Sequence, residues 1–362
     1  MSDALKKAQA HNAQGGGASG GDYQAAKDDI DASCNGGDKP VQPCKSTKAE
    51  RRANRKRQIK ASQDKLAGMP PGKERDELNQ ATTRFAENIN SVEKAQLASN
   101  VYPVKGPDGK LVTPPAPEGW TNISDNPTAL AKYDLTPEDL RIERSEFRAQ
   151  VYEPQPGVFG EDLKPVVAFK GTTPTSGEDW SNNVRQGLNM ESPYYKQAVT
   201  IGRKLRGGGA DVEITGHSLG GGMASAAANA SGSVGTTFNS AGLHPDTVAK
   251  YGGKMLSPPI TAYQVDGEVL TGLQEQGFKG TLAAAGVGFL AGGPVGALIG
   301  ALAKMGLSAG MHDAVGERRP LPSTGGNPVA RHGMDQVIAG IESQKSEDQA
   351  KLAKATGIPI MQ

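Results

Sequence analysis

The stretch Glu213-Ile214-Thr215-Gly216-His217-Ser218-Leu219-Gly220-Gly221-Gly222 decides the fold. Residues 212–215 have the β-branched character of a short buried strand, and residues 223–230 form an Ala-rich pattern typical of a helix. The Gly-x-Ser-x-Gly turn between them predicts a nucleophile elbow, with the Ser218 hydroxyl raised at the positive end of the following helix. Because 48 of the 362 residues are glycine, the flanking strand and helix carry this prediction, and a plain Gly-rich turn is the alternative.

Strands alternate with helices along the rest of the chain. Strands are expected at 147–152, 166–169, 236–238 and 260–265, and helices at 194–205 and near 245–251. The first two strands are expected to form an antiparallel pair that enters the sheet. Alternation of this kind predicts an α/β fold with a mostly parallel central sheet covered on both faces.

The elbow sequence Gly-His-Ser-Leu-Gly-Gly at 216–221 resembles that of class 3 lipases, the fungal-lipase-like branch of the α/β-hydrolases. A block at 166–172, followed by Asp179 and Trp180, is similar to that family's strand and oxyanion loop. The resemblance implies an α/β-hydrolase with a mostly parallel central sheet, acting as a serine lipase or phospholipase on membrane lipids. In general layout the chain is most similar to the lipase and phospholipase effectors of bacterial type VI secretion systems. This resemblance implies a secreted effector toxin that is antibacterial or directed at a host.

Composition divides the chain into three parts. Residues 1–44 lack periodic apolar residues and are expected to be disordered. Residues 45–100 predict a basic and polar helical extension, and residues 101–362 the hydrolase domain. Residues 45–65 carry nine Lys or Arg against two acids, which fits a solvated helix, an adaptor surface or a tether to anionic lipid. Nucleic acid is not an expected partner, because no aromatic residue is interleaved to stack on bases.

The N-terminal residues contain no apolar core of the kind found in a cleaved leader. We therefore expect a protein made in the bacterial cytoplasm and secreted without a cleaved signal peptide. The resemblance implies delivery to the periplasm or membrane of a target cell, with an immunity protein and a secretion-apparatus adaptor as partners. Cys34 and Cys44 fit either two idle thiols or one local bridge.

Two carboxylates compete for the acid of a catalytic triad. In α/β-hydrolases the acid follows the serine in the chain, at the C-terminal end of a strand. Asp266 and Glu268 both follow the strand expected at 260–265. Class 3 lipases place the acid before a hydrophobic pair, which favours Glu268 ahead of Val269 and Leu270, whereas their usual residue type, aspartate, keeps Asp266 open. Both side chains could instead cap a turn.

Five histidines limit the choice of the base. His217 occupies the variable position of the elbow and is expected to point away from the substrate, while His11 and His244 lie in unsuitable positions. His332 precedes an amphipathic pattern at 334–341, and its surroundings resemble the segment around the class 3 lipase histidine. His332 is therefore the predicted base, with His312 as the alternative.

An oxyanion needs two donors. The elbow supplies the backbone N–H of Leu219, and the resemblance implies Thr172 as the second donor, the alternative being a tight turn at 171–174. No metal or cofactor is expected, because the sequence has no cluster of ligands at metal-binding spacing.

Residues 281–303 contain no charged side chain but are rich in Gly and Ala and interrupted by Pro294. We expect an apolar insertion that serves as a lid or membrane-docking element, or a small-residue helix packed on the hydrolase. The sequence also allows two alternative functions: a soluble carboxylesterase or thioesterase, and a membrane-permeabilising toxin that uses 281–303.

Overall fold

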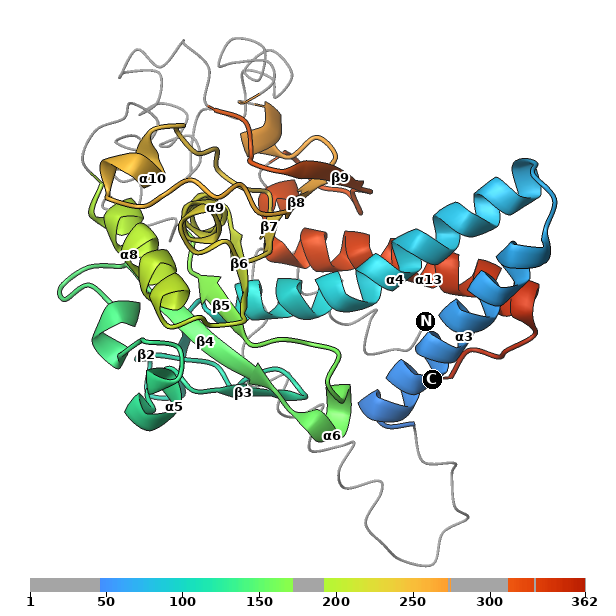
Figure 1. Cartoon of the computed structure of the whole chain (residues 1–362), viewed down its shortest axis with the longest axis horizontal. Helices are drawn as coiled ribbons and strands as arrows, with labels where there is room; N and C mark the ends of the chain where they lie inside the picture. Colours follow the sequence, from blue (N-terminus) through green and yellow to red (C-terminus); the bar gives the residue numbers. More distant parts are fainter. Residues whose placement is uncertain (1–45, 172–191, 273, 275–311, 329, 362) are drawn as a thin grey trace, which may run out of the picture.

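The computed structural model describes residues 46–171, 192–272, 274, 312–328, 330 to 361 (Figure 1). The N-terminal segment with both cysteines, Thr172 and the apolar stretch 281–303 lie outside the described residues. What the sequence predicts for these parts stays a prediction.

A seven-stranded sheet forms the centre of the molecule, in the order β3-β4-β5-β6-β7-β8-β9 (Figure 1). Strands β5 to β9 are parallel, whereas β3, β4 and β5 pair antiparallel. The strands are β3 Trp120–Asn122, β4 Ala149–Pro154, β5 Val166–Phe169, β6 Glu213–His217, β7 Gly235–Phe238, β8 Ile260–Val265 and β9 Glu317–Leu321. The predicted α/β fold with a mostly parallel sheet is confirmed, as is the antiparallel pair at its entrance.

Short elements connect and flank this sheet. They are β1 Val104–Lys105, β2 Leu111–Val112, α5 Pro127–Ala131, η1 Pro137–Leu140, α6 Pro156–Phe159, α10 Thr247–Lys250 and η3 Ala330–His332. At the start of η1, Thr136 and Asp139 form a capping box.

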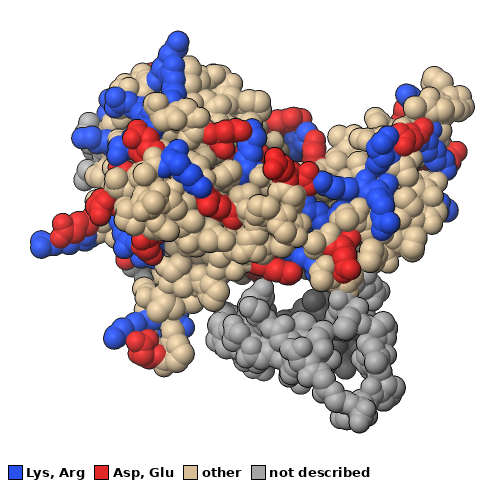
Figure 2. All heavy atoms as spheres, turned by 60° about the horizontal axis from the view of Figure 1, so that its bottom comes forward, with Lys and Arg blue, Asp and Glu red and all other residues tan. Residues whose placement is uncertain are grey.

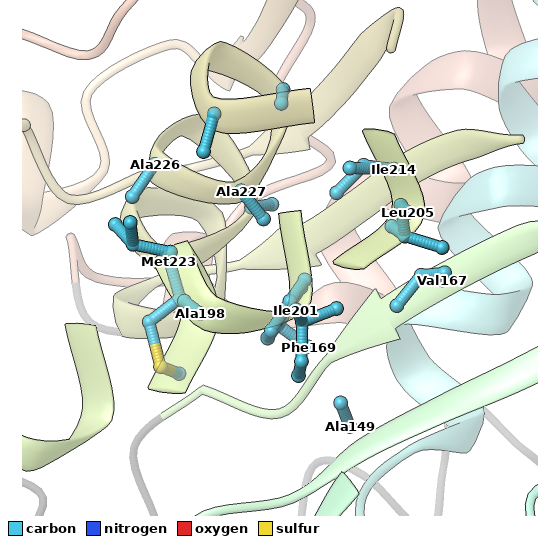
Figure 3. Packing of buried hydrophobic residues seen from close by; sticks show 14 of the residues in the cluster. Ala149, Val167, Phe169, Ala198, Ile201, Leu205, Ile214, Met223, Ala226 and Ala227 are labelled. Atoms are coloured by element: carbon cyan, nitrogen blue, oxygen red, sulfur yellow. The ribbon is translucent and has the colours of Figure 1, made fainter. Parts of the chain in front are cut away.

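One face of the sheet is covered by α8 (Pro193–Gly207) and α9 (Leu219–Ser231) (Figures 1 and 3). The two helices approach closely because their facing residues are small. A Cβ on Gly202 of α8 would overlap the carbonyl oxygen of Ala227 and lie 2.9 Å from Cβ of Ala230. Glycine at this position sets how near α8 can lie to α9, and α9 carries the elbow serine at its start.

The opposite face is covered by α4 (Lys73–Asn100) and α13 (Met334–Thr356) (Figure 1). Although α4 is polar in composition, it places Val92, Ala95 and Ala98 against an apolar cluster of β7, β8 and α13. Its buried charges are paired, since Glu93 accepts from Lys48 at 2.7 Å and Lys94 lies 2.9 Å from Glu213.

Helix α3 (Lys48–Gly68) packs against α4 and α13 where these two helices extend past the sheet (Figure 1). Arg84 of α4 bonds the fully buried Asp348 of α13 through two hydrogen bonds of 2.7 Å. Positive and negative side chains are interspersed over the face seen in Figure 2. Among the helices of the described part, none is both long enough and apolar enough to cross a bilayer.

The close contact of α8 with α9 predicts that Gly202→Ala destabilises the protein by about 1–3 kcal/mol through overpacking. Gly207→Ala in the same helix is the matched control, because Gly207 is exposed and the nearest atom to its added Cβ lies 3.9 Å away. Urea unfolding of both variants measures the difference. Equal stability of the two variants would contradict the role assigned to this contact.

Candidate active site

Ser218 sits in a strained turn between β6 and α9. Its backbone φ is 57° and ψ is −126°, in the left-handed half of the map that non-glycine residues seldom occupy. A Cβ on Gly216 would overlap the main chain of Gly220, and a Cβ on Gly220 would overlap the main chain of β5. These contacts explain why glycine is needed on both sides of the serine. The strand, sharp turn and helix predicted for the elbow are all present.

A buried carboxylate and an imidazole lie against each other near the end of β8. Oε2 of Glu268 is 2.6 Å from Nδ1 of His332, and Glu268 is only 1% exposed. The same carboxylate accepts the backbone N–H of Leu270 at 2.8 Å and that of Thr271. Asp266, two residues earlier, is exposed to solvent. Of the two carboxylates that the sequence leaves open, the structure places Glu268 against His332.

The facing His332 and several hydrogen bonds keep Glu268 ionised despite its burial. Burial alone would raise the pKa of this carboxyl, but the charge of His332 and the hydrogen bonds from His332, Thr271 and Leu270 outweigh it and lower the pKa. A carboxylate in this state can orient the imidazole and stabilise its positive charge.

The main chain of His332 is tied to the elbow. Its carbonyl oxygen lies 2.8 Å from Nε2 of His217 and 3.0 Å from Nδ2 of Asn239. The other ring nitrogen of His217 lies 2.9 Å from the hydroxyl of Tyr102, and the rings of His217 and His332 are 4.9 Å apart. Since His217 directly precedes Ser218, these bonds connect the main chain of the predicted base to the residue next to the predicted nucleophile.

His217 is neutral in the folded protein. Burial, with a smaller contribution from the neighbouring His332, lowers the pKa of His217 to about 3. A carbonyl oxygen can only accept, so Nε2 carries the proton and Nδ1 accepts from the Tyr102 hydroxyl. His217 can therefore position His332 without competing with it for a proton.

Of the two donors expected for the oxyanion, the structure describes Leu219 but not Thr172. Leu219 begins α9 directly after Ser218, with its backbone N–H at the helix N-terminus. Buried Gly171 lies against the elbow, since a Cβ there would overlap the Tyr102 hydroxyl and lie 3.3 Å from Cβ of Ser218. Thr172 follows directly but lies outside the described residues.

His312, the alternative base, is not part of this arrangement. Its ring lies 4.9 Å from that of His244 in an edge-on contact. Within the described ranges, no group of three or more His, Cys, Asp or Glu side chains is placed to hold a metal ion.

Sequence reasoning missed Tyr102 and Asn239 and did not foresee the contacts of His217. Asn239 directly follows β7 and has a positive φ of 41°. Asparagine tolerates this conformation better than most residues, so an asparagine at the end of a predicted strand was a signal that the sequence did contain. Tyr102 gave no signal, because it lies 115 residues before its partner His217.

A strained serine lies at the strand–helix turn of a mostly parallel sheet, and the residue before it is bonded to the main chain of His332, which pairs with the buried Glu268. These features define an α/β-hydrolase-like protein. Comparison with known proteins refines this class. The chain belongs to the Tle-like phospholipase domain family, described as phospholipase-like, whose model matches residues 93–324. The expected relation to lipases and phospholipases is confirmed at the level of this family.

One relative is an extracellular phospholipase A1 from Serratia liquefaciens. It is 35% identical to this chain over 159 residues, which cover 44% of this chain and 44% of the relative. The matched region therefore spans less than half of that protein's length.

The neutral state of His217 predicts an acid-sensitive fold. Its pKa is about 3 in the folded protein, against 6.5 for an ordinary histidine. Above pH 6.5 both states are neutral, but below it only the unfolded chain takes up the proton, so stability falls with falling pH. Between pH 6.5 and pH 5 this costs about 2 kcal/mol.

His217→Gln keeps a donor for the His332 carbonyl and does not titrate, so it should lose about 2 kcal/mol less over the same interval. Urea unfolding of both proteins at pH 7.5, 6.5 and 5 measures the two slopes. Identical slopes for wild type and variant would contradict the neutral His217.

Proposed function

We propose that this protein is a serine phospholipase that hydrolyses acyl esters of membrane lipids through an acyl-enzyme. The observation that carries the proposal is the hydrogen bond between buried Glu268 and His332, whose main chain is bonded to the residue before Ser218. Membership of a phospholipase family supports the substrate class, and so does a relative that is an extracellular phospholipase A1.

The proposed reaction has two acyl-transfer steps. Oγ of Ser218 attacks the ester carbonyl carbon while Nε2 of His332 takes the hydroxyl proton, and Glu268 stabilises the resulting imidazolium. The oxyanion is bound by the N–H of Leu219 and, as predicted from the resemblance, by Thr172. Collapse breaks the bond to the lysophospholipid oxygen, which leaves with the proton from His332.

Water then completes the cycle. His332 removes a proton from a water molecule, which attacks the acyl-enzyme carbonyl, and the second collapse returns the proton to Ser218 and releases a fatty acid. The atoms and charges balance with water as the only co-substrate.

We further propose that the protein is a secreted effector toxin of the class 3 lipase-like branch. The elbow sequence at 216–221 and the extracellular relative support this assignment. In this account an immunity protein protects the producing cell, and an adaptor delivers the chain to the periplasm or membrane of the target cell.

Ser218→Ala tests the proposal. Loss of the nucleophile should lower kcat for fatty-acid release from phospholipid vesicles by at least about 10³-fold. Ser231→Ala, at the other end of α9, is the matched control and should retain wild-type activity. A mixed-chain phospholipid identifies the acyl position from the fatty acid released.

Three results separate this function from its alternatives. Cleavage of short soluble esters or thioesters without release from vesicles would favour a soluble esterase or thioesterase. Toxicity and vesicle leakage that survive Ser218→Ala would favour a membrane-permeabilising protein. Full hydrolysis by the alanine variant would refute the nucleophile.

The choice of acid is tested by Glu268→Gln and Asp266→Asn. Glutamine keeps the size of Glu268 but removes the charge that faces His332, so kcat should fall by about 10³- to 10⁴-fold. Asp266→Asn changes an exposed side chain and should stay close to wild type. The reverse order of the two effects, measured on proteins with matched thermal unfolding, would assign the role to Asp266.

A further inference from the structure

The 104–112 hairpin, formed by β1 and β2, exposes apolar side chains on both of its faces. Val104 pairs with Val112 and Lys105 with Leu111. Because neighbouring side chains in a strand point to opposite faces, one face carries the two valines and the other carries Leu111. Leu111 is 64% exposed, Val112 43% and Val104 36%. Neither face is buried against the protein.

Exposed apolar side chains are concentrated in this hairpin. Among the described residues, six large hydrophobic side chains are exposed, and three of them lie within these nine residues. The other three, Val234, Met255 and Ile360, are far apart in the chain. An isolated two-stranded hairpin is only marginally stable in water. Its exposed apolar side chains therefore indicate a surface that binds another apolar partner.

Both ends of the hairpin are tied to the edge of the sheet that carries Ser218. Tyr102, two residues before β1, contacts His217 and lies against Gly171. Thr113, directly after β2, accepts a 3.2 Å hydrogen bond from Arg148, whose carbonyl accepts the N–H of Lys170 at 2.9 Å. Lys170 directly precedes Gly171. The hairpin thus starts beside the elbow, and its end is connected to the elbow through Arg148 and Lys170.

The charge of the hairpin suits an anionic surface. Lys105 and Lys110 are both exposed, and the single acid, Asp108, lies 3.5 Å from Lys110. One positive charge therefore remains in excess. Lysine stems can lie along apolar groups while their ammonium groups reach lipid headgroups.

We propose that the 104–112 hairpin is a membrane-docking element that places Val104, Leu111 and Val112 at the headgroup–acyl boundary of an anionic bilayer. This rests on the proposed phospholipase function, because only a lipid substrate requires the Ser218 edge to meet a bilayer. The hairpin holds that edge against the membrane, and its lysines contact the headgroups.

The test uses the full chain with Ser218→Ala, so that vesicles stay intact while binding is measured. The vesicles are phosphatidylcholine with phosphatidylglycerol, and flotation gives the partition coefficient. Replacing Val104, Leu111 and Val112 by threonine keeps strand propensity but removes apolar surface, and should lower partition by about tenfold or more. Val234→Thr, an equally small change at another exposed valine, is the control and should leave partition within about twofold.

The single variant Leu111→Thr gives an independent reading should the triple variant fold poorly, and an intermediate loss of partition is expected. Pure phosphatidylcholine vesicles should bind the parent more weakly, and Lys105→Gln with Lys110→Gln should remove that difference. Unchanged partition of the Leu111 and triple variants would overturn the docking role.

An activity measurement separates this inference from the function beneath it. With Ser218 intact, the triple variant should hydrolyse a short soluble ester at the wild-type rate and lose vesicle hydrolysis in proportion to partition. Loss of both activities to the same degree would overturn the docking role in favour of a structural one. If the wild type releases no fatty acid from any phospholipid, the proposed function fails, while flotation still decides whether the hairpin binds lipid.

Discussion

The hydrogen bond between the Glu268 carboxylate and Nδ1 of His332 is the contact on which the proposed site depends. It joins groups that are 64 residues apart in the chain, at 2.6 Å. An ionised carboxylate is tolerated in so buried a position only because the imidazole and two backbone N–H groups bind it. Moving His332 away would leave that charge without its main partner, so the pair also holds the segment that delivers the base.

The parallel sheet brings the remaining parts together. Ser218, Asn239 and Glu268 follow β6, β7 and β8, and the C-terminal ends of neighbouring parallel strands meet at one edge. His332 reaches this edge because α13, which begins two residues later, packs with α4 on the opposite face from α9. The two helix layers thus contribute the two partners of the proposed proton transfer, with His217 bonded between them.

The elbow and strands β4 to β8 could be predicted because their signals are local, namely the glycine spacing around Ser218 and short apolar runs. Strands β3 and β9 were not foreseen, because their sequences Trp-Thr-Asn and Glu-Arg-Arg-Pro-Leu contain no apolar run. The choice between Asp266 and Glu268 could not be predicted, because which side chain turns inward depends on the N–H groups of the following turn. The packing of α4 on the sheet could not be predicted from the sequence either. Its buried charges, Glu93 and Lys94, are paired by residues from distant segments.

The central claim is that Ser218 is the nucleophile activated by His332. The most direct measurement is covalent labelling of the native protein with a fluorophosphonate ester, followed by mass spectrometry of its peptides. The account predicts one label per chain, on Ser218, and strongly slowed labelling when His332 is replaced by alanine. A label on another residue, or labelling of Ser218 at the same rate without His332, would contradict it.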